Sequence, residues 1–307
     1  MRDKILCNKQ IGHWRFVMDV KIENYRVDGS KEFKIKKTPT DSNGLEERKA
    51  ELVEKTHKNS EKIAELQSAL YAEHKEAVLI CFQALDAGGK DSTISHVLTG
   101  VNPLGIDVFS YKGPSADEAS HDFLWRYHKN LPMKGKIAVF NRSYYEEVLV
   151  VKVHEFFKDY DLPSRLKKVD YIKQKYSDIK GFENYLNANS IRVIKFFLNL
   201  SKGEQKKRFL DRINRPEKNW KFSENDIKER QFFEKYQESF EAAINNTSTK
   251  DCPWYVIPAD QKWFARYLVS EVILHVMKDI NPKFPKITKE QEENLANCKN
   301  MLENEGK

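Results

Sequence analysis

The sequence predicts an α/β fold in which a mainly parallel sheet of five strands lies between two layers of helices. First, short apolar runs alternate with longer amphipathic segments, a pattern typical of parallel strands joined by helices. Second, residues 77–84 form a continuous apolar run, which indicates a strand covered on both faces. Third, the unusual polar motifs follow the apolar runs, and parallel sheets bind ligands at the carboxyl ends of their strands. We therefore expect a functional site along one edge of the sheet.

The individual elements follow from the spacing of the apolar residues. Residues 45–74 carry leucines at helical spacing on a charged background, which predicts a long amphipathic helix. Strands are predicted at 77–84, 106–112, 136–141, 191–200 and 254–259. Helical regions are predicted at 115–130, between the third and fourth strands up to about residue 187, from about 202, at 224–245 and at 262–280.

Two Ser-x-x-Glu sequences mark the expected starts of helices. In a capping box, the serine side chain accepts from the backbone N–H three residues on, and the glutamate accepts from the serine N–H. Ser115 with Glu118 and Ser201 with Glu204 have this spacing. We therefore expect an irregular arm (1–44), one α/β domain (45–285) and a polar helical tail (286–307).

Charge and composition narrow the classes of partner. The chain has 53 basic and 46 acidic residues, and the net charge of +7 suits an anionic partner. The apolar runs at 77–82 and 267–277 are too short to span a membrane, and no signal sequence opens the chain. Four scattered cysteines are typical of reduced thiols in a cytosolic protein. We therefore expect a cytoplasmic protein with no membrane partner.

The loop after the first strand, within "FQALDAGGKDSTI", is similar to a phosphate-binding loop. Gly89 and Lys90 match the usual pattern, whereas Ala84 replaces its first glycine and Asp91 replaces its Ser or Thr. Backbone N–H groups would surround phosphate oxygens at the start of the next helix, and Lys90 would add a positive charge. The expected phosphate-binding residues are Ala87, Gly88, Gly89, Lys90, Asp91 and Ser92.

Two carboxylates in this loop indicate a cation. An acidic side chain beside a bound phosphate is favourable only if a metal such as Mg²⁺ lies between them. Asp86 is the expected metal ligand. Asp91 could serve the same ion, or it could cap the helix that begins there.

Further polar side chains follow the second and third strands. Asn141 occupies the position at which P-loop proteins often have a metal-ordering aspartate. Arg142 offers a planar fork of donors for a phosphoryl group in transfer. Lys112 follows the second strand and should lie at the same edge, and Arg126 is on the helix after it.

The helix after the fourth strand is strongly basic. Seven basic residues lie between positions 206 and 221. Arg208, Arg212 and Arg215 share one face, whereas Phe209, Leu210 and Ile213 are expected on a packed opposite face. A basic helical hairpin at this place in P-loop kinases is a lid over the phosphates, so residues 202–224 are the expected lid.

Taken together, these segments resemble the family-2 polyphosphate kinases, which are P-loop proteins related in fold to thymidylate kinase. The resemblance covers roughly residues 25 to 280, with order and spacing preserved. Beside the loop, it rests on "VNPLGIDVFSYKGPSADEASHDFLWRYH", "FNRSYYEEVLVVKVH", "KFFLNLSKGEQKKRFLDRINRPEKNWKFSENDIKER" and "TSTKDCPWYVIPADQKWFAR". The arm segment "YRVDGSKEFKI" also matches.

The resemblance implies Mg²⁺-dependent phosphoryl transfer between inorganic polyphosphate and adenine or guanine nucleotides, with Mn²⁺ as a substitute metal. It implies that Asp86 holds the metal and that Lys90 is the loop lysine. Asn141 with Arg142 would be the Walker B pair, Arg208 and Arg212 the lid arginines, and Lys112 a phosphate-chain contact. It also implies a homo-oligomer, for which the apolar helix at 262–280 is the expected contact.

The sequence departs from the family pattern at four positions. Ala84 and Ser92 replace glycines, Tyr144 stands where histidine is common, and Asn141 replaces an aspartate. The last change is shared with a branch that also has Glu146 after the tyrosines and that uses AMP as well as ADP. AMP and ADP are therefore the expected acceptors, with GDP as a further one.

Three other functions are also considered for this sequence. An ATP-dependent nucleoside monophosphate kinase of the thymidylate kinase type would share the fold, but Asp91 at the hydroxyl position argues against it. A nucleic-acid-binding protein would use the basic helix, but its aromatic residues do not form an open stacking platform. A catalytically inactive scaffold would rest on Ala84 and Asn141.

Overall fold

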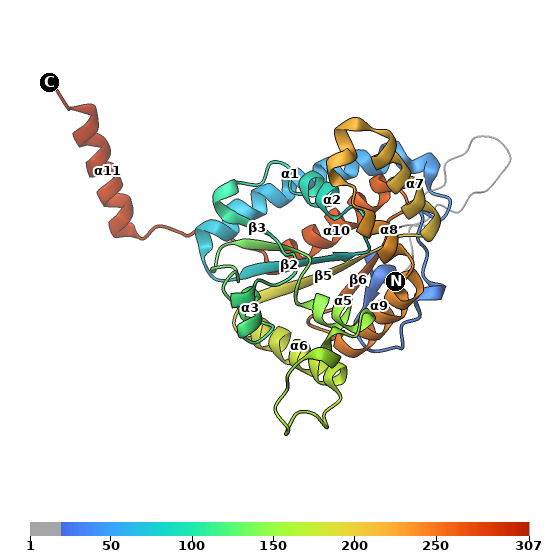
Figure 1. The fold of residues 1–307 in the computed structure, drawn as a ribbon. Helices are drawn as coiled ribbons and strands as arrows, with labels where there is room; N and C mark the ends of the chain where they lie inside the picture. Colours follow the sequence, from blue (N-terminus) through green and yellow to red (C-terminus); the bar gives the residue numbers. More distant parts are fainter. Residues whose placement is uncertain (1–19, 307) are drawn as a thin grey trace.

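The computed structural model describes residues 20–306, which form a three-layered body with one helix projecting from it (Figure 1). The central sheet has six strands in the order β1-β6-β5-β2-β4-β3. All neighbouring strands are parallel except β1, which pairs antiparallel with β6. The strands are β1 (Arg26–Val27), β2 (Ala77–Ala84), β3 (Ile106–Ser110), β4 (Ile137–Asn141), β5 (Ile191–Asn199) and β6 (Trp254–Pro258).

The five predicted parallel strands are confirmed, and the sixth strand comes from the arm. Arg26 pairs with Tyr255 on β6, and the Arg26 guanidinium donates to the carbonyl of Lys250. Farther along the arm, the backbone N–H of Phe33 donates to the side chain of Asn245. The described part of the arm therefore lies over the domain, as predicted, and a two-residue strand leaves no periodicity in the sequence.

Each face of the sheet is covered by its own helices (Figure 1). Along β2, Leu79 and Cys81 enter one core, whereas Val78 and Ile80 enter the other, which explains the continuous apolar run. One face carries α1 (Lys49–Glu73), α2 (Lys90–Val97) and α10 (Lys262–Ile280). The other face carries α4 (Trp125–His128), α5 (Val150–Val153), α6 (Tyr171–Ala188) and α9 (Phe233–Thr247).

Three predicted helical regions are interrupted. The region 115–130 is split into α3 (Ala116–Ser120) and α4, because the Asp122 carboxylate accepts from the Leu124 N–H and forms a turn. Between β4 and α6 the chain forms η5 (Tyr144–Val148), α5 and η6 (Phe156–Asp159) before an irregular stretch. The region 224–245 is divided into α8 (Glu224–Arg230) and α9.

Only one of the two predicted capping boxes is complete. Ser115 and Glu118 exchange both hydrogen bonds at the start of α3. Ser201 accepts from the Glu204 N–H at the start of α7 (Lys202–Asn214), but its own N–H donates to Asp260. The Glu204 carboxylate is used elsewhere, because it accepts from Arg208.

The C-terminal part of the chain contains two very different helices. The apolar helix α10 is mostly buried against the sheet and α1, so the apolar residues that suggested a subunit contact belong to the core of the domain. In contrast, α11 (Lys289–Glu303) buries no residue and projects from the body (Figure 1). Among the described helices, none combines the length and apolarity that a membrane span requires.

Candidate active site

The predicted phosphate-binding loop connects β2 to α2 at the carboxyl edge of the sheet. Ala87 and Gly89 have positive φ values of 59° and 94°, and the Gly88 N–H donates to the Leu85 carbonyl at 2.9 Å. A Cβ atom at Gly88 would lie 2.5 Å from the Ala84 Cβ and 2.8 Å from the Leu85 oxygen. The loop therefore requires glycine at position 88, because Ala84 already fills the adjacent space.

Lys90 is the first residue of α2 and folds back onto the strand. Its Nζ donates to the Ala84 carbonyl at 3.1 Å. Burial lowers the pKa of Lys90 to about 8, and the positive charge of Arg142 acts in the same direction. The negative charges of Asp86, Glu146 and Asp91 oppose this shift only in part, and a bound phosphate would add to them.

Asp91 is tied to the third predicted strand. Its Oδ1 accepts from the Asn141 amide at 2.8 Å, and the same amide group lies 3.3 Å from Ser110 Oγ. The N-cap of α2 is Gly89, without a side-chain cap, so the helix-capping alternative for Asp91 is wrong. Asn141 acts here as a donor, and the structure brings it beside the loop as expected.

Arg142 is held between two carboxylates. Its Nη2 donates to Asp86 Oδ1 at 2.9 Å, and its Nη1 lies 3.6 Å from Glu146 Oε2. Glu146 raises the pKa of Arg142, whereas burial raises the pKa of Glu146. The backbone of Arg142 has a φ of 64°, a conformation that costs energy in a residue other than glycine. Its N–H is fixed to the Phe82 carbonyl at 3.1 Å.

The predicted lid, residues 202–224, contains α7 and η7 (Pro216–Lys221); α8 follows it directly, and the three elements together are called the lid below (Figure 1). Arg208 on α7 is buried, and its guanidinium donates to the carbonyls of Ala87, Ala259 and Asp260. The predicted lid arginine thus fastens the lid to the loop. Arg212 lies on the same face and approaches Asp226 on α8 at 3.4 Å.

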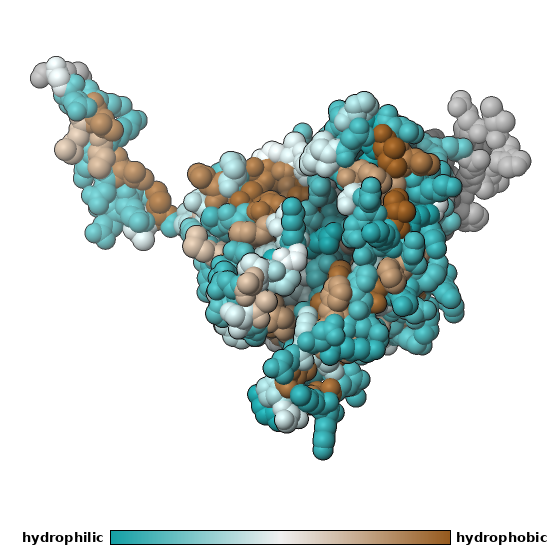
Figure 2. All heavy atoms as spheres, viewed as in Figure 1, coloured by the Kyte–Doolittle hydropathy of each residue, from teal (hydrophilic) through white to brown (hydrophobic). Residues whose placement is uncertain are grey.

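The opposite face of α7 is less packed than the sequence suggested. Phe209 is buried, but Leu210 and Ile213 are 47% and 45% exposed, so the expectation of a packed face is wrong for these two residues. Figure 2 shows apolar surface over the lid, whereas hydrophilic residues line the hollow beside it.

Lys112 and Arg126 line a cavity of about 930 Å³ next to the loop. Arg126 donates to the Lys112 carbonyl at 3.0 Å and lies 5.1 Å from the ring centroid of Tyr111. Arg142 and Glu146 also line this cavity, and they line a small cavity of about 40 Å³ together with Asp86. The Arg142–Glu146 pair therefore forms a wall that the two cavities share. The large cavity has further aromatic residues in its lining: Phe123, Tyr127, Phe156, Tyr160 and Tyr171.

Two side chains that sequence reasoning missed connect the lid to the loop. Arg230 on α8 donates to Gln205 Oε1 at 2.6 Å, and Gln205 Nε2 donates to the Asp86 carbonyl at 3.0 Å. Both residues act through an amide or a backbone carbonyl, so no residue type in the sequence signals their role.

The carboxylates at this edge are suitable for a hard divalent cation. Burial raises the pKa of Asp226 on the lid, and the negative charge of Asp86 raises it further, so the two carboxylates are close enough to influence one another. Within residues 20–306, no three His, Cys, Asp or Glu side chains form a metal-binding group. Mg²⁺ usually takes only one or two carboxylates and completes its shell with water and phosphate, so this donor set fits Mg²⁺.

Known proteins with similar sequences and structures agree with this architecture. A family model described as polyphosphate kinase 2 (PPK2) matches residues 46–285. An ADP-polyphosphate phosphotransferase from Rhodopseudomonas palustris is 44% identical over 287 residues, which cover 93% of this chain and 99% of that protein. An AMP/ADP-polyphosphate phosphotransferase from Meiothermus ruber is 39% identical, covering 86% and 96%. The crystal structure of polyphosphate kinase 2 from Arthrobacter aurescens TC1 gives a TM-score of 0.80 at 33% identity, over 89% of this chain and 95% of that one.

Proposed function

This chain belongs to the polyphosphate kinase 2 family, and we propose that it transfers phosphoryl groups reversibly between inorganic polyphosphate and nucleoside mono- or diphosphates. It is a transferase with a phosphate group as acceptor. The observation that supports this function best is the Asp86–Arg142–Glu146 cluster. It joins a phosphate-binding loop to a cavity of about 930 Å³, a volume within the range of small-molecule sites.

The reaction needs positioning and positive charge more than a strong base. A terminal phosphate oxygen of the acceptor is already ionised at neutral pH and can attack the end phosphorus of polyphosphate in line. Lys90 and the backbone N–H groups of the loop would bind the phosphates. Arg142 would contact the transferring group, where its two donors can stabilise charge that develops between the reacting oxygens. The bond to the next polyphosphate unit breaks as the new P–O bond forms.

We propose Asp86 as the carboxylate that holds Mg²⁺, with Mn²⁺ as a substitute. The metal, when bound, neutralises charge on the phosphate oxygens. One Asp86 oxygen binds Arg142, and Asp226 on the lid, whose pKa the charge of Asp86 helps to raise, is a further carboxylate candidate. Arg212 is paired with Asp226, so the two side chains would approach the bound phosphates together.

The large cavity is the proposed site of the acceptor nucleoside. Its aromatic side chains offer apolar surface for a base, and Lys112 and Arg126 supply charge for phosphates. Glu146 lies at the boundary between this cavity and the loop. We propose that AMP and ADP are acceptors, with GDP as a further one, and that Glu146 is the residue tied to AMP use.

Other functions are not favoured. An ATP-dependent nucleoside monophosphate kinase would need a free hydroxyl at position 91, whereas Asp91 is bonded to Asn141. Binding of nucleic acid through the basic helix is also not favoured, because Arg208 is buried against the loop. We expect the enzyme to act as a homo-oligomer in the cytoplasm, where its nucleotide substrates are found.

The test is nucleotide production by the purified protein with Mg²⁺. AMP, ADP and GDP are offered separately, with polyphosphate or ATP as the donor. We expect ATP from ADP plus polyphosphate, and ADP from AMP plus polyphosphate. Turnover only with ATP and a nucleoside monophosphate would contradict the proposal. Production from ADP but not from AMP would contradict the role given to Glu146.

A further inference from the structure

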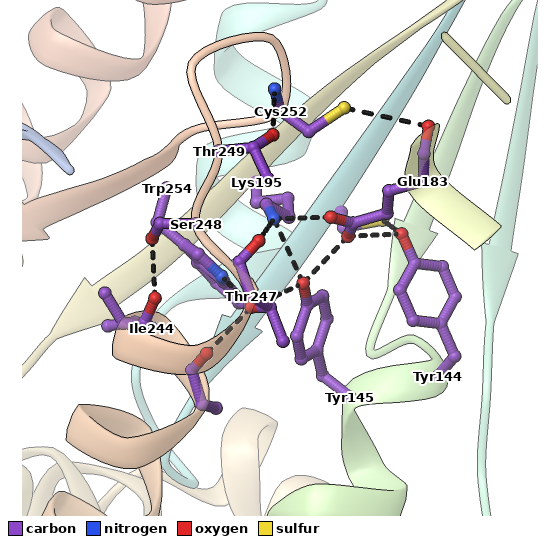
Figure 3. A network of polar contacts seen from close by, with 12 residues as sticks. Tyr144, Tyr145, Glu183, Lys195, Ile244, Thr247, Ser248, Thr249, Cys252 and Trp254 are labelled. Carbon is purple, nitrogen blue, oxygen red and sulfur yellow. Dashed lines mark hydrogen bonds and ion pairs between the residues drawn. The ribbon is translucent and has the colours of Figure 1, made fainter. Parts of the chain in front are cut away.

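A buried ion pair lies in the core within a network of polar contacts that includes Tyr144 and Tyr145 (Figure 3). Lys195 on β5 and Glu183 on α6 have side chains that are 0% and 1% exposed, and Lys195 Nζ lies 2.6 Å from Glu183 Oε2. Placing two charges in a core is costly, and a well-packed apolar pair is often as stable. A contribution to stability therefore does not explain why this buried ion pair is present.

Every polar atom of the pair has partners. Lys195 Nζ donates to Glu183, to the Tyr145 hydroxyl at 3.1 Å and to the Thr247 carbonyl at 3.0 Å. Glu183 Oε1 accepts from the hydroxyls of Tyr144 at 2.9 Å and Tyr145 at 2.8 Å. Burial keeps both tyrosines neutral, because it raises the pKa of each hydroxyl well above its ordinary value. One carboxylate thus holds two consecutive side chains.

These two tyrosines are neighbours in sequence of the proposed site residues. They open η5 and lie between Arg142 and Glu146, the pair that forms the wall between the two cavities. The backbone of Arg142 is in the left-handed region, which persists only when neighbouring contacts hold it. Both tyrosines are fully buried in the core, although Tyr144 also borders the large cavity, and the Arg142–Glu146 pair lines both cavities. An anchor on the two rings therefore fixes the position of the pair.

We propose that the Lys195–Glu183 pair is a positioning device, which holds Tyr144 and Tyr145 so that Arg142, paired with Glu146, meets the reacting phosphates. Neither charged residue touches substrate. The inference rests on the proposed function of Arg142. It extends the site to Lys195 on β5 and Glu183 on α6, which act only through the residues that they hold.

The test removes single hydroxyl groups and keeps the rings. Tyr145→Phe loses the contacts of its hydroxyl to Glu183, Lys195 and Thr247. Tyr144→Phe loses the contacts of its hydroxyl to Glu183 and Cys81. We expect kcat to fall about tenfold or more, because small displacements of a positioned group have large kinetic costs. KM for polyphosphate should change little, since the ground-state phosphate contacts of the loop remain.

A double-mutant cycle with Arg142→Ala separates an effect on the position of Arg142 from a general loss of stability. If the network acts through Arg142, Tyr145→Phe should have less than about a twofold further effect on kcat in the Arg142→Ala background. Its effect on the free energy of unfolding should be the same in both backgrounds. If Tyr145→Phe does not fold, Tyr144→Phe enters the same cycle.

Asn59→Ala is the control for stability alone. Asn59 on α1 donates to Ser270 and Glu271 on α10, on the other face of the sheet. This variant should lose stability while kcat, measured well below the unfolding midpoint, stays at the wild-type value. A kcat loss in the control equal to that of Tyr145→Phe at matched stability would overturn the inference.

Two other outcomes would overturn it and can be told apart. If Arg142→Ala lowers kcat but Tyr145→Phe has its full effect in both backgrounds, only the positioning device is wrong. If Arg142→Ala itself keeps the wild-type kcat, the proposed function of Arg142 is wrong, and the inference falls with it.

Discussion

Lys90 shows how strongly a single side chain depends on its surroundings. Without a phosphate, its ammonium group has the Ala84 carbonyl as a partner and lies close to the positive charge of Arg142. Burial, the larger influence, lowers its pKa to about 8. The group is therefore charged at neutral pH, and part of that charge is lost under mildly alkaline conditions.

A pH dependence of polyphosphate binding follows from this pKa. A lowered lysine pKa means that the charge is full below about 8 and is lost as the pH rises through that value. KM for polyphosphate should then rise, by up to about tenfold per pH unit. Lys90→Arg keeps its charge at these pH values, so its KM should stay level. An equal rise of KM in both proteins would assign the titration to another group.

At the scale of elements, the loop geometry depends on one crowded glycine. We predict that Gly88→Ala lowers the free energy of unfolding by about 1–3 kcal/mol, because its Cβ would collide with Ala84 and the Leu85 carbonyl. Denaturant unfolding measures this change. The matched control is Gly181→Ala, at an exposed position in α6 where a Cβ meets nothing within 4 Å. This control should be stabilising by about 0.5–1 kcal/mol, and a loss as large as that of Gly88→Ala would contradict the steric explanation.

The elements also show what the sequence could predict. The strands β2, β4, β5 and β6 leave apolar runs because most of their residues are buried, and the partly exposed edge strand β3 leaves a weaker pattern, whereas β1 is too short to leave any. A local turn at Asp122 interrupts a helix that looked continuous. In the candidate site, the residue types and their positions after predicted strands were enough to single out Asp86 and Arg142. The parts played by Gln205 and Glu183 depend on tertiary contacts that no local spacing reveals.

At the scale of the whole molecule, the body and the tail are energetically separate. The helix α11 buries no residue, so the tail adds little to the stability of the domain. Removal of residues 286–307 should leave the unfolding midpoint and kcat unchanged. A longer truncation that also removes Met277, which is fully buried in α10, should lower the midpoint. Thermal unfolding and a turnover assay measure both effects. If the shorter truncation clearly lowered the unfolding midpoint, the tail would have to pack against a protein surface.

The central claim is that the loop between β2 and α2 carries phosphoryl transfer from polyphosphate. The most direct measurement compares ATP formation from ADP and polyphosphate by the wild-type protein and by Lys90→Ala, after both are shown to be folded. We predict turnover by the wild type and a loss of about a hundredfold or more in the variant, as expected when one contact to developing charge is removed. Near-normal turnover by Lys90→Ala would contradict this account of the site.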